Sequence, residues 1–128
     1  MIRYGDDHVW ARCVEREALI GVSHHLQTLL GNILFVDLPS PSLMLRQGAL
    51  IATIESVKTA IEVHSPVSGF VTGINTELYK APKLINDDAE GAGWLIRIRL
   101  EHRRDINALM DAQSYRALVQ REIGSMPA

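Results

Sequence analysis

The chain alternates short apolar runs with polar or glycine-containing breaks, a pattern typical of a protein built mainly from β-strands. The clearest run is 94–100, where Ile96 and Ile98 alternate with Arg97 and Arg99. This period of two predicts a half-buried strand, which we place at the edge of a sheet. A second run, 32–39, is apolar at nearly every position and predicts a buried strand. Further strands are expected at 9–22 (a hairpin turning near Arg16 and Glu17), 48–55, 60–65 and 70–74.

Helices are expected at two places. Ser23 is a typical helix N-cap and Gly31 a typical residue just past a helix end, so we predict a two-turn helix between them. Its apolar face should consist of Leu26, Leu29 and Leu30, which have i, i+3, i+4 spacing. Near the C-terminus, apolar residues at helical spacing predict two short helices that meet near Asp111 and Ala112. The segment 78–93, with its proline, glycines and acidic residues, is expected to be an irregular loop.

Composition narrows the class of protein. The chain has 128 residues, enough for one domain with a real core. A formal charge of −2 argues against the strongly basic surface of a nucleic-acid binder. Cys13 is the only cysteine, so no internal disulfide forms and a reducing compartment is expected. No signal peptide and no run of roughly 20 apolar residues is present, so we expect a cytoplasmic protein without membrane attachment.

One lysine stands out by its setting. Lys58 falls in a small polar break between two β-rich runs, 48–55 and 60–65, and so should lie on the exposed corner of a β-hairpin. A rigid hairpin that presents one reachable amine is what a modifying ligase needs in order to choose that lysine. The local pattern alone also fits an ordinary solvated lysine in a turn.

Motifs along most of the chain resemble those of one family. The segment 55–58 (ESVK), followed by 66–69 (PVSG), is similar to the lipoylation hairpin of the H protein of the glycine cleavage system, a lipoyl carrier. The resemblance extends from about Tyr4 to Val119. Other matching segments are 21–23 (GVS), 36–39 (VDLP), 84–86 (LIN), 93–94 (GW) and 111–112 (DA) with Tyr115.

The resemblance implies a mainly β (α+β) fold, a lipoyl/biotinyl-type barrel-sandwich hybrid with short side helices and a C-terminal helix. It implies a single carrier domain over 1–128, with its core at about 4–119 and a frayed end at 120–128. It also implies lipoate attached covalently to Lys58 by a lipoate-protein ligase or lipoyl transferase, and no catalytic residue in the carrier itself. The residues expected to form the setting of the lipoyl-lysine are Glu55, Ser56, Val57, Thr59 and Glu62.

Some positions depart from the family pattern. Val9 stands where the family has a glutamate that resembles the natural acceptor for a cationic aminomethyl group, and a valine there forfeits a charge-assisted bond worth roughly 1.5–3 kcal/mol. Glu62 replaces an aspartate, and His64, Ser42 and Phe70 also differ. Because these departures are expected to cluster where the arm would dock, we favour a specialised lipoate-binding protein of sulfur oxidation, beside a heterodisulfide-reductase-like complex. The alternatives are a true H protein, with glycine decarboxylase, aminomethyltransferase and dihydrolipoyl dehydrogenase as partners, and an unmodified binding scaffold.

Other sites are not predicted. His24 and His25, even with His8 or Cys13, lack the spacing of a metal site, so we expect a solvated helix start and no metal. Cys13 is expected to be a buried structural thiol. The acidic residues Asp87, Asp88 and Glu90 lack calcium-loop spacing and should form an acidic loop. Biotin is disfavoured because Val57 and Thr59, rather than methionines, flank the hairpin lysine.

Overall fold

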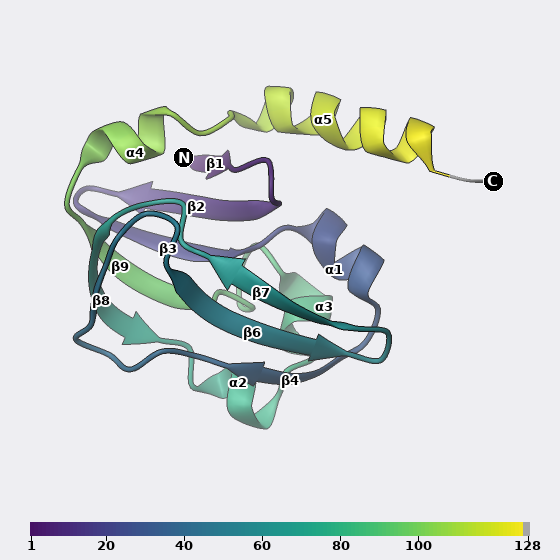
Figure 1. Cartoon of the computed structure of the whole chain (residues 1–128), viewed down its shortest axis with the longest axis horizontal. Coiled ribbons are helices and arrows are strands. Elements are labelled where there is room, and N and C mark those ends of the chain that lie inside the picture. Colours follow the sequence, from purple (N-terminus) through teal and green to yellow (C-terminus); the bar gives the residue numbers. More distant parts are fainter. Residues whose placement is uncertain (127–128) are drawn as a thin grey trace.

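The computed structural model describes residues 1–126 and consists of two antiparallel sheets with short helices around them (Figure 1). The larger sheet has the strand order β1 (Ile2–Tyr4), β2 (Val9–Val14), β3 (Glu17–Val22), β9 (Ile96–Leu100), β8 (Gly69–Ile74) and β5 (Met44–Leu45). The smaller has the order β4 (Ile33–Asp37), β6 (Leu50–Ser56) and β7 (Ala60–His64). The predicted mainly β architecture, with strands near the expected places, is confirmed.

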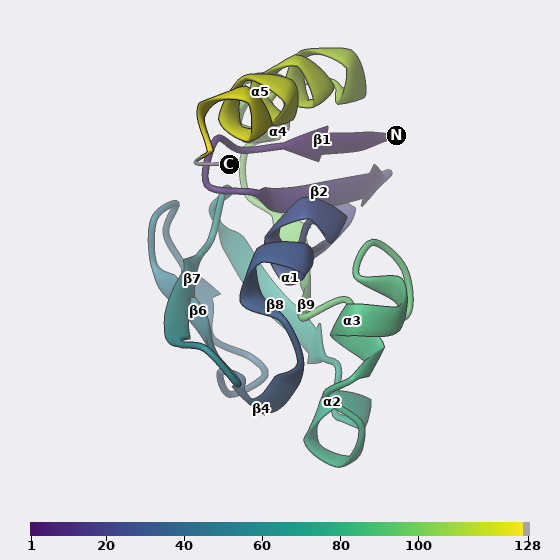
Figure 2. The ribbon, with the colours of Figure 1, turned by 90° about the vertical axis from the view of Figure 1, so that its right-hand side faces the viewer.

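The two sheets share one hydrophobic core. A single cluster of buried residues includes Ile20 and Ile98 of the larger sheet and Val36, Ile54 and Val63 of the smaller. Burial of each such side chain stabilises the fold by about 1.5–3 kcal/mol. Figure 2 shows the smaller sheet beside β8 and β9, with the α2 and α3 region on the other side of these strands.

Two strand predictions need correction. The run at 94–100 alternates as expected, but β9 lies between β3 and β8 and is not an edge strand. Alternation reports which face of a sheet is solvated, not whether a strand has two neighbours. The strand at 33–37 is also not buried throughout, since Leu34 and Phe35 are 60% and 53% exposed. A register shift between Ile33 and Phe35 turns both side chains outward.

The first helix, α1 (His24–Leu30), begins and ends as predicted. Ser23 Oγ accepts the Leu26 N–H at 3.1 Å, and Gly31 has a φ of +76° that a side chain would disfavour. The predicted apolar face is wrong in part, because Leu29 is exposed while Gln27 and Leu30 are buried. The buried amide of Gln27 has a hydrogen-bond partner in Asn86.

The segment 78–93 is not the irregular loop expected from its composition. It contains α2 (Glu77–Lys80) and α3 (Leu84–Asp88), and each fixes one fully buried side chain, Leu78 and Ile85. Helices of four and five residues are too short to show a 3.6-residue period, so their proline, glycine and acidic surroundings dominate the pattern.

The C-terminal part runs through α4 (Arg103–Asn107) and α5 (Ala112–Ser125), which confirms two helices meeting near Asp111. Asp111 caps α5 by accepting the Ser114 N–H at 2.8 Å, and Tyr115 stacks on Tyr4 with ring centroids 4.1 Å apart. This places α5 alongside β1 and β2 (Figure 1). The helix continues to Ser125, whereas the sequence predicted fraying from residue 120; residues 127–128 lie outside the described part. None of the helices within residues 1–126 is long and apolar enough to cross a membrane.

Candidate functional site

The predicted attachment lysine lies where the sequence placed it, in the turn between β6 and β7. The two strands pair antiparallel up to Glu55 and Ala60, and Val57, Lys58 and Thr59 connect them. Lys58 is exposed. None of the ion pairs found among residues 1–126 involves its amine. The amine is therefore accessible while its backbone is fixed by two paired strands.

Ser56 fixes the shape of this turn. Its Oγ accepts the backbone N–H groups of Lys58 and Thr59, both at 3.2 Å, and donates to the Thr59 carbonyl at 3.1 Å. The Ser56 backbone N–H also donates to that carbonyl, at 2.8 Å. A serine that satisfies the polar groups of a turn in this way lowers the number of conformations the turn samples.

The turn rests on the connection between α1 and β4. The Val57 N–H donates to the Asn32 carbonyl at 3.0 Å. At Gly31, a Cβ atom would lie 3.4 Å from Val57 Cγ2 and 3.6 Å from Lys58 Cε. A Cβ there would make ordinary van der Waals contact with both side chains, so the positive φ of Gly31, rather than a lack of space, favours glycine at this place.

Asn86, on α3, holds that connection in place. Its Nδ2 donates to Gln27 Oε1 and to the Gly31 carbonyl, and its Oδ1 accepts the Ile33 N–H, all at 2.9 Å. The buried amide of Gln27 has its partner here. The sequence marked Asn86 only as part of a resemblance and missed this role, because nothing in the pattern shows that 27–33 and 86 meet.

For the other predicted setting residues, no polar contact with the amine of Lys58 is found within residues 1–126. Glu55, Thr59 and Glu62 are exposed, and Glu62 Oε1 lies 3.6 Å from His64 Nε2. No hydrogen bond or ion pair within the described residues joins Glu62 to the turn. Among the flanking residues, Ser56 shapes the turn through its hydroxyl, and Val57 joins the turn to the carbonyl of Asn32.

Lys58 is one of three lysines in the chain, and the other two have different surroundings. Lys80 ends α2 and Lys83 immediately precedes α3. Only Lys58 lies between two paired strands. A ligase that recognises a β-hairpin thus finds one suitable amine.

The departures from the family pattern do not surround this turn. His64 pairs with Leu50 at the opposite end of the hairpin, and Phe70 pairs with Met44 in the other sheet. Val9 is 2% exposed and packs in the core. Strand pairing therefore places His64 and Phe70 away from the turn, and the expectation that the departures cluster at the docking place of the arm stays a prediction.

Two predictions about reactive side chains also change. Cys13 is half-buried, with Sγ 3.4 Å from the Glu15 carbonyl, rather than a fully buried thiol. His24 is exposed as expected at a helix start, but the His25 side chain is only 12% exposed. His25 Nε2 lies 3.8 Å from Oε1 of Glu122 in α5, a contact that a local pattern does not reveal.

Of the acidic residues of 87–90, Asp87 and Asp88 are exposed as expected, whereas Glu90 is half-buried and hydrogen-bonded. Asp88 ends α3 and accepts the Ala92 N–H at 2.9 Å. Glu90 accepts the Tyr4 hydroxyl at 2.6 Å and the His24 N–H at 2.9 Å. Burial, together with the hydrogen bond to Glu90, raises the pKa of Tyr4. The Glu90 carboxylate therefore connects the segment after α3 to β1 and α1, whereas Asp88 stabilises its own turn.

Comparisons with known proteins agree with this geometry. The family model described as "Glycine cleavage H-protein" matches residues 2–122. The chain is 43% identical to the glycine cleavage system H protein of Aeromonas salmonicida, covering 94% of this chain and 95% of that one. It is 35% identical to the H protein of Thermotoga maritima, with 95% and 98% covered. A crystal structure of the H protein from Mycobacterium marinum superposes with a TM-score of 0.82 at 26% identity, covering 94% and 96%. The predicted lipoyl-domain-like fold is thereby confirmed.

Proposed function

Because this chain belongs to the glycine cleavage H-protein family, whose members carry lipoate covalently attached to a lysine, we propose that Lys58 is that lysine. The single observation that carries the proposal is the exposed amine of Lys58 on a turn held by two paired strands. Attachment forms an amide between Nζ and the carboxyl carbon of lipoate, with loss of the activating group and of a proton from the amine. Once bound, the dithiolane supplies the disulfide chemistry that accepts and releases the transferred group.

The residues of the chain itself contribute position and not catalysis. Ser56 and the contact of Val57 with Asn32 hold the turn, so the base of the arm stays fixed while its far end reaches partner enzymes. Tethering raises the effective concentration of the carried group at each partner, to the millimolar range for short linkers. We treat the 128 residues as one carrier domain, since buried residues of both sheets form a single cluster.

The pathway favoured for this carrier is glycine cleavage. Relatives with 35–43% identity over nearly the whole chain bear that system's name. The partners are then a lipoate ligase or lipoyl transferase, glycine decarboxylase, aminomethyltransferase and dihydrolipoyl dehydrogenase.

Modification of Lys58 is tested by intact-mass measurement after co-expression with a lipoate ligase in the presence of lipoate. The wild-type chain should gain the mass of one lipoyl group, and Lys58→Arg should gain none. Lys80→Arg and Lys83→Arg are the matched controls, which keep the charge and should be modified as fully as the wild type. Modification that survives in Lys58→Arg, or no modification of the wild type, refutes the assignment.

The pathway is tested separately with the lipoylated protein. Added to glycine decarboxylase, aminomethyltransferase and dihydrolipoyl dehydrogenase, it should support release of carbon dioxide from glycine, whereas the unmodified Lys58→Arg protein should not. A protein that is fully lipoylated but inactive in this assay would contradict the glycine cleavage role and favour another cargo, such as that of sulfur oxidation.

A further inference from the structure

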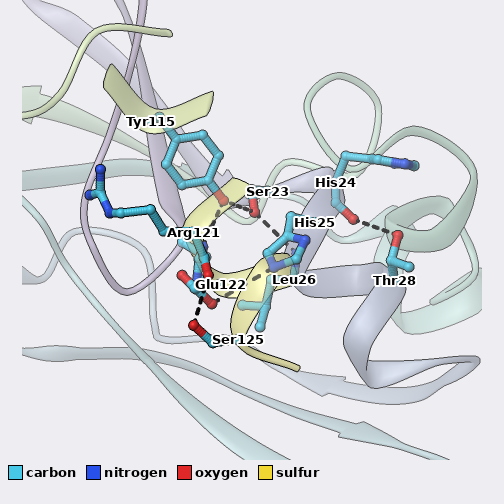
Figure 3. A network of polar contacts seen from close by, with 10 residues as sticks. Ser23, His24, His25, Leu26, Thr28, Tyr115, Arg121, Glu122 and Ser125 are labelled. Atoms are coloured by element: carbon cyan, nitrogen blue, oxygen red, sulfur yellow. Dashed lines mark hydrogen bonds and ion pairs between the residues drawn. The ribbon is translucent and has the colours of Figure 1, made fainter. Parts of the chain in front are cut away.

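Three side chains that the carrier role does not use meet between the start of β2, the start of α1 and the last turns of α5. They are His8, His25 and Glu122, here called the His-Glu cluster (Figure 3 shows His25 and Glu122). His8 Nε2 lies 2.9 Å from Glu122 Oε2, and His25 Nε2 lies 3.8 Å from Glu122 Oε1. One ligand atom from each residue falls within 4.8 Å of the others. Segments more than 90 residues apart thus bring together two imidazoles and a carboxylate.

The cluster is sheltered but not closed. The side chains of His8 and His25 are 10% and 12% exposed, and that of Glu122 is 35% exposed. Within residues 1–126, the buried Nε2 of His25 has no hydrogen-bond partner. A buried polar atom without a partner destabilises the fold, so a group that satisfies it is favoured at this place. The ion pair with Glu122 gives His8 a partner for its Nε2 atom, but the Nε2 atom of His25 still lacks a hydrogen-bond partner among these residues.

Hydrogen bonds behind the cluster orient His8. The Tyr115 hydroxyl donates to Ser23 Oγ at 2.6 Å, and its oxygen lies 2.7 Å from His8 Nδ1. Because that hydroxyl donates its only hydrogen to Ser23, its oxygen acts as the acceptor for the Nδ1–H of His8. When a metal ion replaces the Nε2 proton that pairs with Glu122, the lone pair of the neutral ring is then on Nε2 and faces the cluster. Metal-binding histidines are typically held in this way, with the second ring nitrogen donating to a neighbouring group.

We propose that Nε2 of His8, Nε2 of His25 and the carboxylate of Glu122 bind one Zn²⁺ ion. Two histidines and a glutamate are a ligand set that zinc takes in proteins, with bond lengths of about 2.0–2.2 Å. Ligand atoms at two corners of such a tetrahedron are about 3.3 Å apart. Glu122 Oε1 lies 3.1 Å from His8 Nε2 and 3.8 Å from His25 Nε2, on either side of this value. The exposed side of Glu122 leaves the fourth position to water, and the ion connects α5 to α1 and β2.

Other histidine–carboxylate pairs of the chain lack these features. His64 with Glu62 and His102 with Glu101 are pairs of exposed neighbours, with no third ligand nearby among the described residues. The His-Glu cluster therefore differs from these surface ion pairs in both its burial and its third ligand.

The test is isothermal titration of Zn²⁺ into untagged, EDTA-dialysed full chain near pH 7.5. We expect one Zn²⁺ per chain. His25→Ala and Glu122→Gln should each weaken binding by about tenfold or more. The matched control is His24→Ala, which removes the adjacent, exposed histidine and should leave the affinity unchanged. Thermal melting supplies a second readout, since Zn²⁺ at about 100 times its Kd should raise the melting temperature of the wild type by on the order of 10 °C.

Several outcomes would overturn the site. These are no binding by a folded wild type, equal weakening by His24→Ala and His25→Ala, or a melting shift that persists in Glu122→Gln. The titration is repeated with Lys58→Arg, because a reduced lipoyl arm also binds zinc through sulfur. An affinity that disappears in that variant assigns the ion to the arm and refutes the His-Glu cluster.

Discussion

Asn86 offers the sharpest test of how the attachment turn is supported. Replacement by alanine removes its three 2.9 Å hydrogen bonds, to Gln27, Gly31 and Ile33. It leaves the helix backbone of α3 intact, because alanine is a good helix former. The connection between α1 and β4 then loses its link to α3, and with it the support on which Val57 rests.

The expected cost follows from those contacts. A neutral hydrogen bond contributes about 1 kcal/mol net, and a buried group left without a partner costs about 1–3 kcal/mol. The Ile33 N–H belongs to a buried residue and loses its partner, whereas Gly31 is only partly covered. We therefore expect Asn86→Ala to lower the free energy of unfolding by about 3 kcal/mol. With a urea m-value of about 2 kcal/mol/M, the midpoint should fall by about 1.5 M.

The assay is equilibrium urea unfolding followed by circular dichroism. Asn32→Ala is the control, since it changes an asparagine of the same connection whose exposed side chain makes no hydrogen bond among the described residues. Its effect should stay within about 0.5 kcal/mol. If Asn86→Ala costs no more than Asn32→Ala, the amide of Asn86 does not hold the connection and the reasoning fails.

Three further predictions concern the turn, the tyrosines and the glycines. Ser56→Ala should slow ligase modification of the hairpin by about tenfold, since the turn loses roughly 1.4 kcal/mol of local order; unchanged modification kinetics by mass spectrometry would contradict this. Burial raises the pKa of Tyr115 from 10.0 to about 12. The folded state therefore holds the hydroxyl proton of Tyr115 more tightly than the unfolded chain does, and the free energy of unfolding should fall as pH rises above about 10. The fall should be less steep in Tyr115→Phe, and urea midpoints measured at several pH values will show the difference. Gly21→Ala should destabilise the chain by about 1–3 kcal/mol, because the added Cβ would lie 2.7 Å from the buried ring of Trp10. Gly124→Ala, in open space on α5, should stabilise the chain by about 0.4–1 kcal/mol. Thermal melting that ranks these two variants the other way round would refute the packing argument.

The β-rich architecture and the position of Lys58 were predictable because both depend on local pattern. Alternation at 94–100 and the polar break around Lys58 are properties of a few adjacent residues. The cap residues Ser23 and Gly31 were equally readable, since a hydroxyl and a positive φ act within one turn. Short elements were not readable, and α2 and α3 were mistaken for a loop because each buries a single side chain.

By itself, the sequence determined the family, the fold class and which lysine is presented on a hairpin, because these follow from motifs and periods along the chain. Only the tertiary structure decided what surrounds them. It separated His64 and Phe70 from the turn, placed Val9 in the core, and brought Asn86 to Gly31 and His25 to Glu122. The physical reason is that such contacts join residues tens of positions apart, and strand pairing and helix packing set them without leaving a trace in any local pattern.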